Sequence, residues 1–357
     1  MEALTASIPV QRTAKSRLST VDFSNLGFGN YISDHMLIID YKNGKWQEPA
    51  IVPYGDLQLS PAMLSLHYGQ TVFEGMKAFK NKNGDISIFR PQRHCQRFNK
   101  SLERLCMPTI SEELFINSIA ALVEADVDWI PTSEGSSLYL RPFMFATESR
   151  LGVKISDEYK FIILTSPVGP YFSKPVRVKV EEEYVRAAEG GTGFAKCGGN
   201  YAAAFYPTML ANQQGFDQVL WTDAREHKYI DESGAMNVMF VLDGKLVTPK
   251  LTTSLLDGVT RNSILALADS LGIEKEERKV SVAEIEEGFK NGKLTEAFGV
   301  GTAAVVSPIA AINIHGKDYT LTPADANSFQ QRAKKKLHDI RMGVEADVHG
   351  WNYIVKQ

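Results

Sequence analysis

The sequence predicts an α+β protein built from two mixed domains. Its 357 residues, 44% of them hydrophobic, can bury a large core, and this length favours about two domains. Stretches with strand-like alternation and stretches with helical spacing follow one another along the chain. Between them lies PVGPYFSKP at 167–175, a segment dense in proline and glycine that is typical of a linker.

These observations divide the chain into four parts. Residues 1–25 are expected to form a flexible N-terminal arm, and 26–167 a small α/β domain. Residues 168–178 are the expected interdomain linker, and 179–357 form a large domain. The arm lacks the apolar stretch of a secretory signal, and its Glu2 favours a cytosolic arm over an organellar transit peptide.

In the expected small domain, strands alternate with one clear helix. Residues 36–54 and 75–91 each read as two strands around an Asn-Gly turn. Residues 91–106 follow helical spacing, and Pro91 suits the first helical position. The remaining β-rich stretches are 137–147 and 160–172.

The expected large domain also mixes the two element types. A helical run is expected from about Tyr201 to Gln214, behind a glycine pair. The other expected strands are 217–223, 237–248 and 296–306, and the other expected helices lie near 260–271 and 324–342.

Charge and composition argue against several classes of protein. The formal net charge of -3 provides no bulk positive field for nucleic acid, and no apolar run approaches the ~20 residues of a membrane-spanning helix. The three cysteines, Cys95, Cys106 and Cys197, form no CxxC pair, which indicates reduced thiols in a cytosol. No HExxH, GxSxG, P-loop or EF-hand motif is present, so neither a metal site nor a catalytic triad is expected.

The stretch FAKCGGNYAAAF at 194–205 contains the first candidate for chemistry. Taken alone, Lys196 is either a surface charge beside a flexible turn or an amine held in place for covalent chemistry. Its neighbour Cys197 has no histidine near it in sequence, so we interpret it as a packing residue.

Charged side chains in two other stretches have two readings each. The basic stripe of the 91–106 helix is either a solvated face or contains one arginine that reaches inward to a phosphate, and the spacing does not say which one. Its members are Arg93, Arg97, Lys100 and Arg104. In YIDESGAMNVMFV, Glu232 is either solvated at a strand edge or buried against a cationic partner.

Two glycine-containing turns are candidates for binding anions. In LDGVTRNS, the amides of Val259 and Thr260 would lie at a helix N-terminus and favour phosphate, and the alternative is an ordinary Asp-Gly turn capped by Asp257. FGVGTAA at 298–304 approaches a dinucleotide-binding pattern, but Pro308 prevents the long helix that this pattern needs. We therefore expect a tight turn with exposed amides there and no nicotinamide site.

Together these pieces resemble one family, the branched-chain amino acid aminotransferases, which are pyridoxal-phosphate enzymes of fold type IV. The resemblance runs from about Asp34 to the C-terminal helices, and its motifs follow the family's order. They are HYGQTVFEGMKAFK, FRP with the arginines after it, YLRPFMFATE, KCGGNYA, DESGAMN, LDGVTRNS and FGVGTAAVV.

The resemblance implies an architecture and a reaction. It implies the two-domain fold of D-amino acid aminotransferase-like enzymes, with the cofactor at the domain interface and 179–357 as the pyridoxal-phosphate-binding domain. It implies reversible ping-pong transfer of an amino group between L-leucine, L-isoleucine or L-valine and 2-oxoglutarate, through a Schiff base of pyridoxal 5′-phosphate. It also implies a cytoplasmic homodimer whose partners are these amino acids and 2-oxo acids.

The same resemblance assigns roles to residues of this chain. The implied cofactor-binding residues are Arg97, Lys196, Tyr201, Glu232, Val259, Thr260 and Thr302. Lys196 would form the Schiff base, Tyr201 would bond the phenolic oxygen and Glu232 the ring nitrogen, and the others would hold the phosphate. The implied substrate contacts are Tyr68, Phe73, Tyr139, Arg141, Leu151, Val153, Tyr171, Thr302 and Ala303. Arg141 would receive the side-chain carboxylate of glutamate, and Tyr68, Leu151 and Val153 would come from the partner subunit.

Relatives within the fold class and departures from the family pattern bear on this interpretation. A D-amino acid aminotransferase or an aminodeoxychorismate lyase would share Lys196 and Glu232 but not the paired YLRP and FEGMKAF motifs. A non-catalytic binding protein would not need Lys196. Mammalian members carry a redox CxxC where this chain has Ala304 and Ser307, so thiol regulation is not expected there.

Overall fold

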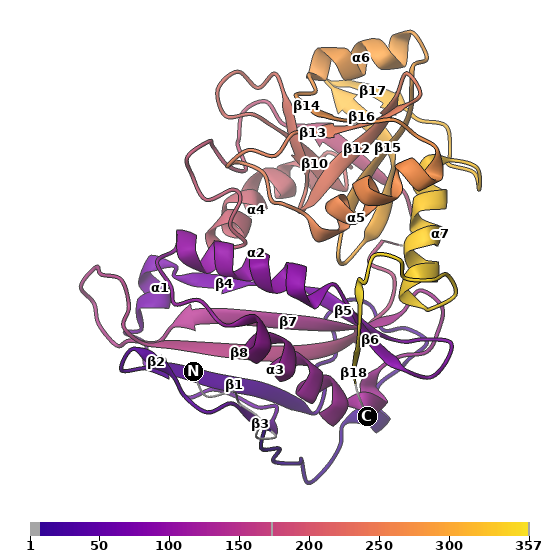
Figure 1. Cartoon of the computed structure of the whole chain (residues 1–357). Coiled ribbons are helices and arrows are strands. Elements are labelled where there is room, and N and C mark those ends of the chain that lie inside the picture. The colour runs from indigo at the N-terminus through magenta and orange to yellow at the C-terminus, as the bar shows by residue number, and fades with distance from the viewer. Residues whose placement is uncertain (1–7, 173, 356–357) are drawn as a thin grey trace. The chain divides into compact units, whose positions relative to one another are not determined.

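The computed structural model describes residues 8–172 and 174–355, and the chain divides into two compact units (Figure 1). The first unit consists of the described residues up to Tyr171, Ala195–Gly198 and those from Arg341 on, and the second consists of Phe172–Phe194 and Gly199–Ile340. The chain thus first leaves the first unit inside the segment 168–178, which the sequence suggested as a linker. Both units combine helices with a sheet, which confirms the predicted α+β class.

The first unit is a nine-stranded sheet with helices packed on it. Its strands are β1 (His35–Lys42), β2 (Lys45–Trp46), β3 (Ala50–Pro53), β4 (Thr71–Phe73), β5 (Met76–Lys80), β6 (Ile86–Phe89), β7 (Ser137–Ala146), β8 (Tyr159–Val168) and β18 (Asn352–Val355). Its helices are α1 (Leu64–Tyr68), α2 (Pro91–Arg104) and α3 (Glu112–Ala125), with 3-10 turns at Leu18–Thr20 and Val127–Trp129. The strand order is β18-β6-β5-β7-β8-β1-β2, and β3 pairs with β1 and β4 with β7.

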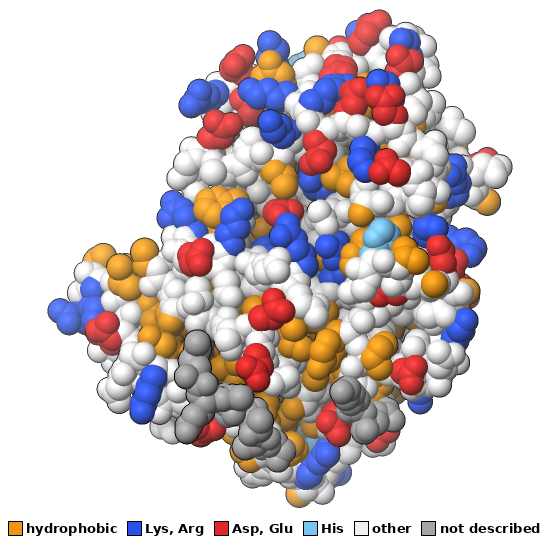
Figure 2. Space-filling view, in the orientation of Figure 1, with side chains coloured by type: hydrophobic (Ala, Val, Ile, Leu, Met, Phe, Trp, Pro, Cys, Tyr) orange, Lys and Arg blue, Asp and Glu red, His pale blue; other side chains and the backbone are white. Residues whose placement is uncertain are grey.

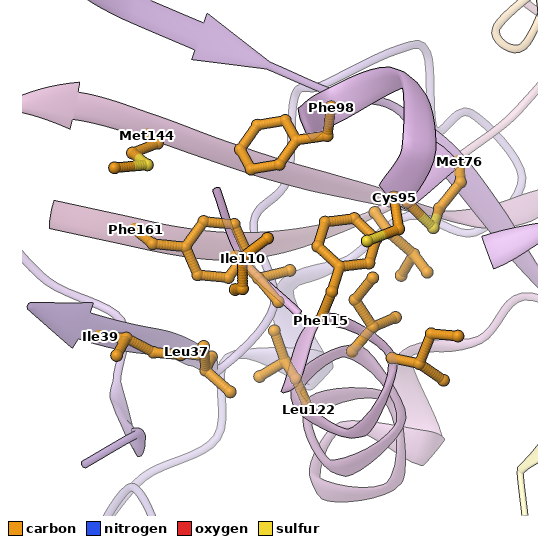
Figure 3. Close-up of a cluster of buried hydrophobic side chains, with 14 of the residues drawn as sticks. Leu37, Ile39, Met76, Cys95, Phe98, Ile110, Phe115, Leu122, Met144 and Phe161 are labelled. Atoms are coloured by element: carbon orange, nitrogen blue, oxygen red, sulfur yellow. The ribbon is translucent and has the colours of Figure 1, made fainter. Parts of the chain in front are cut away.

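The core of the first unit lies between one face of this sheet and helices α2 and α3. Figure 3 shows Phe98 of α2 and Phe115 of α3 converging with Phe161 of β8. Met76 of β5 and Met144 of β7 belong to the same buried cluster (Figure 3). Because side chains alternate along a strand, the residues next to these core positions point to the opposite face of the sheet.

The ends of the two helices follow from local sequence. Pro91 occupies the first turn of α2, as predicted, and fixes a helical φ where no N–H is needed. Helix α3 was not among the predicted helices, although its start is signalled: the Ser111 hydroxyl accepts a hydrogen bond from the Leu114 N–H at 3.1 Å, and Glu112 and Glu113 fill the first turn.

The second unit is built on a second nine-stranded sheet, part of which closes on itself. Its strands are β9 (Val176–Val180), β10 (Gln218–Thr222), β11 (Ile230–Ser233), β12 (Met236–Leu242), β13 (Lys245–Pro249), β14 (Lys275–Arg278), β15 (Leu294–Gly301), β16 (Val305–Ile314) and β17 (Lys317–Thr320). Its helices are α4 (Gly198–Gln213), α5 (Val259–Leu267), α6 (Val282–Lys290) and α7 (Phe329–Arg341), with a 3-10 turn at Asp269–Leu271. The strand order is β11-β10-β9-β16-β15-β12-β13-β14, and pairing of β11 with β12 closes the first six of these strands into a ring.

Two expected boundaries need correction. The arm 1–25 was expected to be flexible, but from Ile8 on the structure ties it to the first unit, while residues 1–7 lie outside the described part. The Ile51 N–H donates to the Pro9 carbonyl at 3.0 Å, and the Arg17 N–H donates to Asp34 at 2.8 Å. The expected large domain, 179–357, differs at its end, because β18 pairs with β6 and brings the C-terminal strand into the first sheet.

The surface and the helices also bear on the class of protein. On the face drawn in Figure 2, acidic and basic side chains alternate over the second unit. Within 8–172 and 174–355, no helix combines the length and apolarity needed to cross a membrane.

Candidate active site

In the first unit, the structure places Lys196 in a short extended stretch whose backbone is held from two directions. The Phe73 N–H donates to the Lys196 carbonyl at 3.0 Å, and the Lys196 N–H donates to the Ser101 hydroxyl at 2.9 Å. The next residue, Cys197, forms an antiparallel backbone β-bridge with Val72. Its side chain is buried in the core, as expected of a packing residue. Lys196 is therefore an amine on a fixed backbone and not a charge beside a flexible turn.

An aromatic ring lies beneath this amine. The Lys196 Nζ is 4.5 Å from the centroid of the Phe73 ring, and the Arg141 guanidinium carbon is 4.9 Å from the same centroid. Arg141 also lies 5.2 Å from the Tyr139 ring centroid, and its Nη2 donates to the Tyr139 hydroxyl at 3.2 Å. The structure thus gathers four of the residues that the resemblance singled out.

One further aromatic residue belongs to this group and was missed from sequence. Phe28 makes edge contacts with Tyr139 and with Tyr171, with ring centroids 4.9 Å apart in both pairs. It extends the aromatic wall and links the predicted substrate contact Tyr171 to the others. Its local sequence, between two glycines in GFG, gives no sign of this role.

Next to this group, Arg97 projects from α2 onto a buried carboxylate. The carboxylate of Glu74, fully buried in the turn between β4 and β5, accepts hydrogen bonds from Arg97 Nε at 2.6 Å and from Arg97 Nη2 at 2.9 Å. It also accepts from His94 Nδ1 at 2.8 Å and from the Gly75 N–H at 3.0 Å. One edge of the Arg97 guanidinium is therefore fixed, which fixes the direction of the whole fork.

The charges of this cluster follow from its burial and its hydrogen bonds. Burial opposes ionisation of Glu74, but the Arg97 guanidinium and the hydrogen bond from His94 hold the pKa of this carboxyl far below its usual range. Burial lowers the pKa of His94 despite the neighbouring Glu74. His94 is therefore a neutral donor at pH 7, and Glu74 and Arg97 form the ion pair.

The structure also decides which member of the basic stripe turns inward. Arg97 is 8% exposed, whereas Arg93 is half-buried and Lys100 and Arg104 are exposed. Sequence alone could not make this choice, because it depends on Glu74, which lies on a different element. The signal for Glu74 itself was available, as a single acid within the apolar stretch TVFEGM.

In the second unit, Glu232 is buried on β11 and faces a cation, as one of its two readings required. Its Oε1 accepts hydrogen bonds from the Leu256 N–H at 2.8 Å and from Asn237 Nδ2 at 3.1 Å. Its Oε2 lies 3.1 Å from Arg186 Nε, a charge contact without hydrogen-bond alignment. Sequence reasoning did not identify Arg186, whose Nη2 donates to the carbonyls of Gly193 and Ser254 and so anchors the guanidinium.

The side chain of Asn237 connects Glu232 to the segment just before α5. Asn237 Nδ2 donates both to Glu232 and to the Leu256 carbonyl, at 2.9 Å for the latter. Gly258 is the N-cap, and a Cβ built there would lie 2.0 Å from the Asn237 Oδ1, so only glycine fits. The N-cap position belongs to Gly258 and so lies one residue after Asp257, the residue that the alternative reading named as the cap.

The remaining cofactor candidates lie at turns of the second unit. Val259 and Thr260 are the first residues of α5, where backbone N–H groups have no partner within the helix. Thr302 and Ala303 form the turn between β15 and β16, and Tyr201 is in the first turn of α4. The side chains of Thr302, Ala303 and Tyr201 are half-buried.

Three substrate candidates lie apart from this group, on the surface of the first unit. Tyr68 at the end of α1 is 42% exposed, and Leu151 and Val153 in the β7–β8 loop are 69% and 81% exposed. The Tyr68 hydroxyl donates to the Leu151 carbonyl. These three residues therefore form a separate, outward-facing group.

Comparisons with known proteins agree on one family. A family model described as "Amino-transferase class IV" matches residues 71–312. The chain is 46% identical over 335 residues to the branched-chain-amino-acid transaminase 1 of Bacillus subtilis (strain 168), covering 92% of this chain and 94% of that protein. It is 45% identical over 363 residues to a probable branched-chain-amino-acid aminotransferase of Staphylococcus aureus (strain N315), covering 99% of both.

Solved structures give the same result. The branched-chain amino acid aminotransferase from Escherichia coli matches with a TM-score of 0.72 at 26% identity, covering 89% of this chain and 99% of that chain. The T.th. branched-chain amino acid aminotransferase complexed with N-(5′-phosphopyridoxyl)-L-glutamate matches with a TM-score of 0.71 at 26% identity, covering 89% and 98%. The chain therefore belongs to the class IV aminotransferases, and the relatives to which it is similar over most of its length are branched-chain-amino-acid aminotransferases.

Proposed function

We propose that the chain is a branched-chain amino acid aminotransferase that transfers the amino group reversibly between L-leucine, L-isoleucine or L-valine and 2-oxoglutarate. The observation that carries this proposal is the Lys196 amine, held by backbone bonds above the Phe73 ring within the family match. The names of the relatives at 45% and 46% identity support the choice of substrates.

The residues present fit pyridoxal 5′-phosphate by the chemistry of their donors. Its aldehyde matches the Lys196 amine, and its phosphate matches Arg97 together with Thr302 and the N–H groups at the start of α5. Its ring nitrogen matches the buried carboxylate of Glu232, and its phenolic oxygen matches the Tyr201 hydroxyl. When bound, this cofactor supplies an electron-accepting ring for the charge left on the substrate Cα after proton removal.

Lys196 is the proton carrier in this proposal. Its Nζ would take the proton from the substrate Cα. It would hold this proton and give it back in the next proton-transfer step of the reaction. A base of this kind needs a fixed position, which the hydrogen bonds of its backbone N–H and carbonyl provide. The Phe73 ring lies 4.5 Å from Nζ and covers one side of the amine.

Two buried ion pairs keep the cofactor contacts oriented. Glu74 holds one edge of Arg97 and so fixes the direction of the guanidinium, which would bind the phosphate of the cofactor. Arg186 lies beside Glu232 and favours the carboxylate anion, which is the form that keeps a ring nitrogen protonated. Neither Glu74 nor Arg186 was among the residues that the resemblance assigned.

The substrate side chain meets an aromatic wall. Phe73, Tyr139 and Tyr171, extended by Phe28, offer apolar contact to a branched aliphatic group. Such a wall separates substrates that differ by one methylene by only about 1–3 kcal/mol, so all three branched-chain amino acids are accepted. Arg141 supplies the cation for the second carboxylate of glutamate or 2-oxoglutarate.

The surface group of Tyr68, Leu151 and Val153 supports a homodimer. Figure 2 shows hydrophobic side chains gathered on the projecting part of the first unit, where Figure 1 draws the β7–β8 loop. Ile155 in the same loop is 55% exposed. An exposed apolar cluster of this kind marks an interaction site, and a second copy of the chain is the partner that the family resemblance implies. The three unpaired thiols suit a reducing cytoplasm, where we place the enzyme.

Half-reaction spectroscopy tests the proposal. The protein incubated with pyridoxal 5′-phosphate and freed of excess should show a visible absorbance band that L-leucine, L-isoleucine and L-valine bleach. Lys196→Ala should lose both this band and the activity, with its thermal unfolding midpoint measured as the control for folding. A colourless wild-type protein would refute the proposal, and bleaching by D-alanine but not by L-leucine would assign the chain to the D-specific relatives.

A further inference from the structure

A cavity of about 250 Å³ lies within the second unit, and none of the residues that line it is assigned to the cofactor or the substrate. Its walls come from 187–189, from the connection between β10 and β11 with the start of β11, from 249–255 and from Lys279. Pockets for drug-sized ligands span about 300–1,000 Å³, so this cavity fits a smaller molecule.

One wall of the cavity is held in shape by hydrogen bonds of its own. The Asp223 carboxylate accepts from the backbone N–H groups of Arg225 at 3.2 Å, Glu226 at 3.0 Å, Lys228 at 2.9 Å and Tyr229 at 2.8 Å. These bonds fix the loop between β10 and β11 without any ligand. This wall is therefore preformed, and a ligand does not have to order it before it binds.

The inner part of the cavity contains a buried carboxylate. Asp231 lines the cavity and is 8% exposed, and it accepts a hydrogen bond from the Ser254 hydroxyl, which also belongs to the lining. Because side chains alternate along a strand, Asp231 points to the face of β11 opposite Glu232. Burial and the charge of Glu232 raise the pKa of Asp231 to about 6, and Arg186 opposes this shift only in part. A cation that reaches this carboxylate is therefore strongly favoured.

Apolar and cationic side chains complete the lining. Ile230 and Leu255, both buried, give the inner part of the cavity an apolar surface. Lys250 and Lys279 are exposed and lie at its mouth, and the Lys279 Nζ is 4.7 Å from the centroid of the Tyr229 ring. The cavity therefore offers a carboxylate and an apolar surface inside, and cations at its opening.

Three further charged residues at the mouth do not change this pattern. They are Arg225, Glu189 and Glu226, and all three are exposed. Exposed charges interact weakly in water, and together with Arg225 the two lysines outnumber these two acids. Asp231, in contrast, is buried, so it decides which charge the inner end of the cavity accepts.

We propose that this cavity binds a free α-amino acid as a zwitterion. The ammonium group pairs with Asp231, and the side chain of the ligand contacts Ile230 and Leu255. The carboxylate of the ligand lies between Lys279 and Lys250 at the mouth. The residues assigned to the reaction take no part, so this is a second amino acid site that is separate from the substrate site and does not depend on the proposed function.

Binding of L-leucine in the cavity can be separated from its binding at the substrate site. The holoenzyme is first reduced with borohydride, which fixes the cofactor on Lys196. It is then saturated with 4-methylvalerate, which has the carboxylate and the branched chain of leucine but no ammonium group. L-leucine is titrated into this complex by calorimetry, and we expect saturable binding. The amine 3-methylbutylamine keeps the ammonium group and lacks the carboxylate, and it should bind about tenfold more weakly than L-leucine.

Variants of the lining assign this binding to the cavity. Asp231→Asn should weaken L-leucine binding at least about tenfold. Lys279→Met should weaken L-leucine binding about threefold and leave the affinity for 3-methylbutylamine unchanged. The matched control is Lys317→Met, which removes another exposed lysine of the second unit, with its Nζ 4.8 Å from the Tyr319 ring centroid and outside the cavity lining. It should change neither affinity.

The proposal is overturned if wild type shows no saturable binding of L-leucine, or if Asp231→Asn binds L-leucine as tightly as wild type does. Failure of the proposed function gives a different result. A chain that binds no pyridoxal 5′-phosphate would refute the function, but the same titration can be carried out on that protein, because the cavity lies within one unit and the measurement needs no turnover.

Discussion

The ion pair between Glu74 and Arg97 leads to a quantitative prediction for Glu74→Gln. The carboxylate is fully buried and accepts four hydrogen bonds, two from Arg97, one from His94 and one from the Gly75 N–H. Glutamine keeps the size but removes the charge and turns one acceptor into a donor facing other donors. Removing one partner of a buried pair costs about 3–5 kcal/mol, because the remaining charge stays buried without compensation.

Urea unfolding of the cofactor-free protein measures this cost. Trp46, Trp129 and Trp351 belong to the first unit and Trp221 to the second, so tryptophan fluorescence reports mainly on the unit that contains Glu74. We expect a clearly lower unfolding midpoint for Glu74→Gln at pH 7.5. The folded-state pKa of Glu74 is depressed, so its contribution is present above the unfolded value near 4.3 and is lost as the pH falls below it. The difference in the free energy of unfolding between wild type and Glu74→Gln should therefore become smaller below about pH 4.

A double variant separates the ion pair from simple packing. Glu74→Gln combined with Arg97→Met removes the uncompensated charge and should be less destabilised than Glu74→Gln alone. Additive losses in the two single variants, or a change of less than about 1 kcal/mol in Glu74→Gln, would refute the reasoning.

Two more predictions concern the second unit. Burial and the neighbouring Glu232 raise the pKa of Asp231 to about 6 from a usual 3.8, so stability is lost as the pH rises from about 4 to about 6. Asp231→Asn should therefore be more stable than wild type by up to about 3 kcal/mol at pH 8, and no more stable than wild type below pH 4, as measured by thermal unfolding. An equal increase in stability at the two pH values would contradict the assigned cause. Gly258→Ala places a Cβ 2.0 Å from the Asn237 Oδ1 and should weaken pyridoxal 5′-phosphate binding about tenfold in a fluorescence titration. Gly55→Ala, whose Cβ meets nothing within 4 Å, is the matched control, and equal affinities of the two variants would refute the proposed contact.

Local patterns in the sequence predicted many elements well. The helix expected at 91–106 is α2, and the Asn-Gly turn at 83–84 separates β5 from β6. Both succeed because proline and glycine act on their own backbone, with no help from distant residues. The 237–248 stretch illustrates the limit: its Asp-Gly pair splits it into β12 and β13, which form a hairpin.

Distant pairings account for what the sequence did not predict. The C-terminal strand β18 pairs with β6, and nothing in its sequence NYIV indicates that it will pair with a strand so far away along the chain. The same limit applies within the candidate site. The residue types of Glu232 and Arg97 could be noted from sequence, but their counter-ions Arg186 and Glu74 come from other elements and appear only in the folded chain.

The way in which the chain is shared between the two units has a consequence for its synthesis. The backbone passes between the units four times, after Tyr171, Phe194, Gly198 and Ile340. No single cut therefore releases either unit as one continuous piece of chain. As the protein leaves the ribosome, the first sheet cannot pair its last strand, β18, until the whole second unit has been synthesised. A truncated product that lacks β18 would expose the edge of β6, so premature termination yields an aggregation-prone fragment and not a smaller working domain.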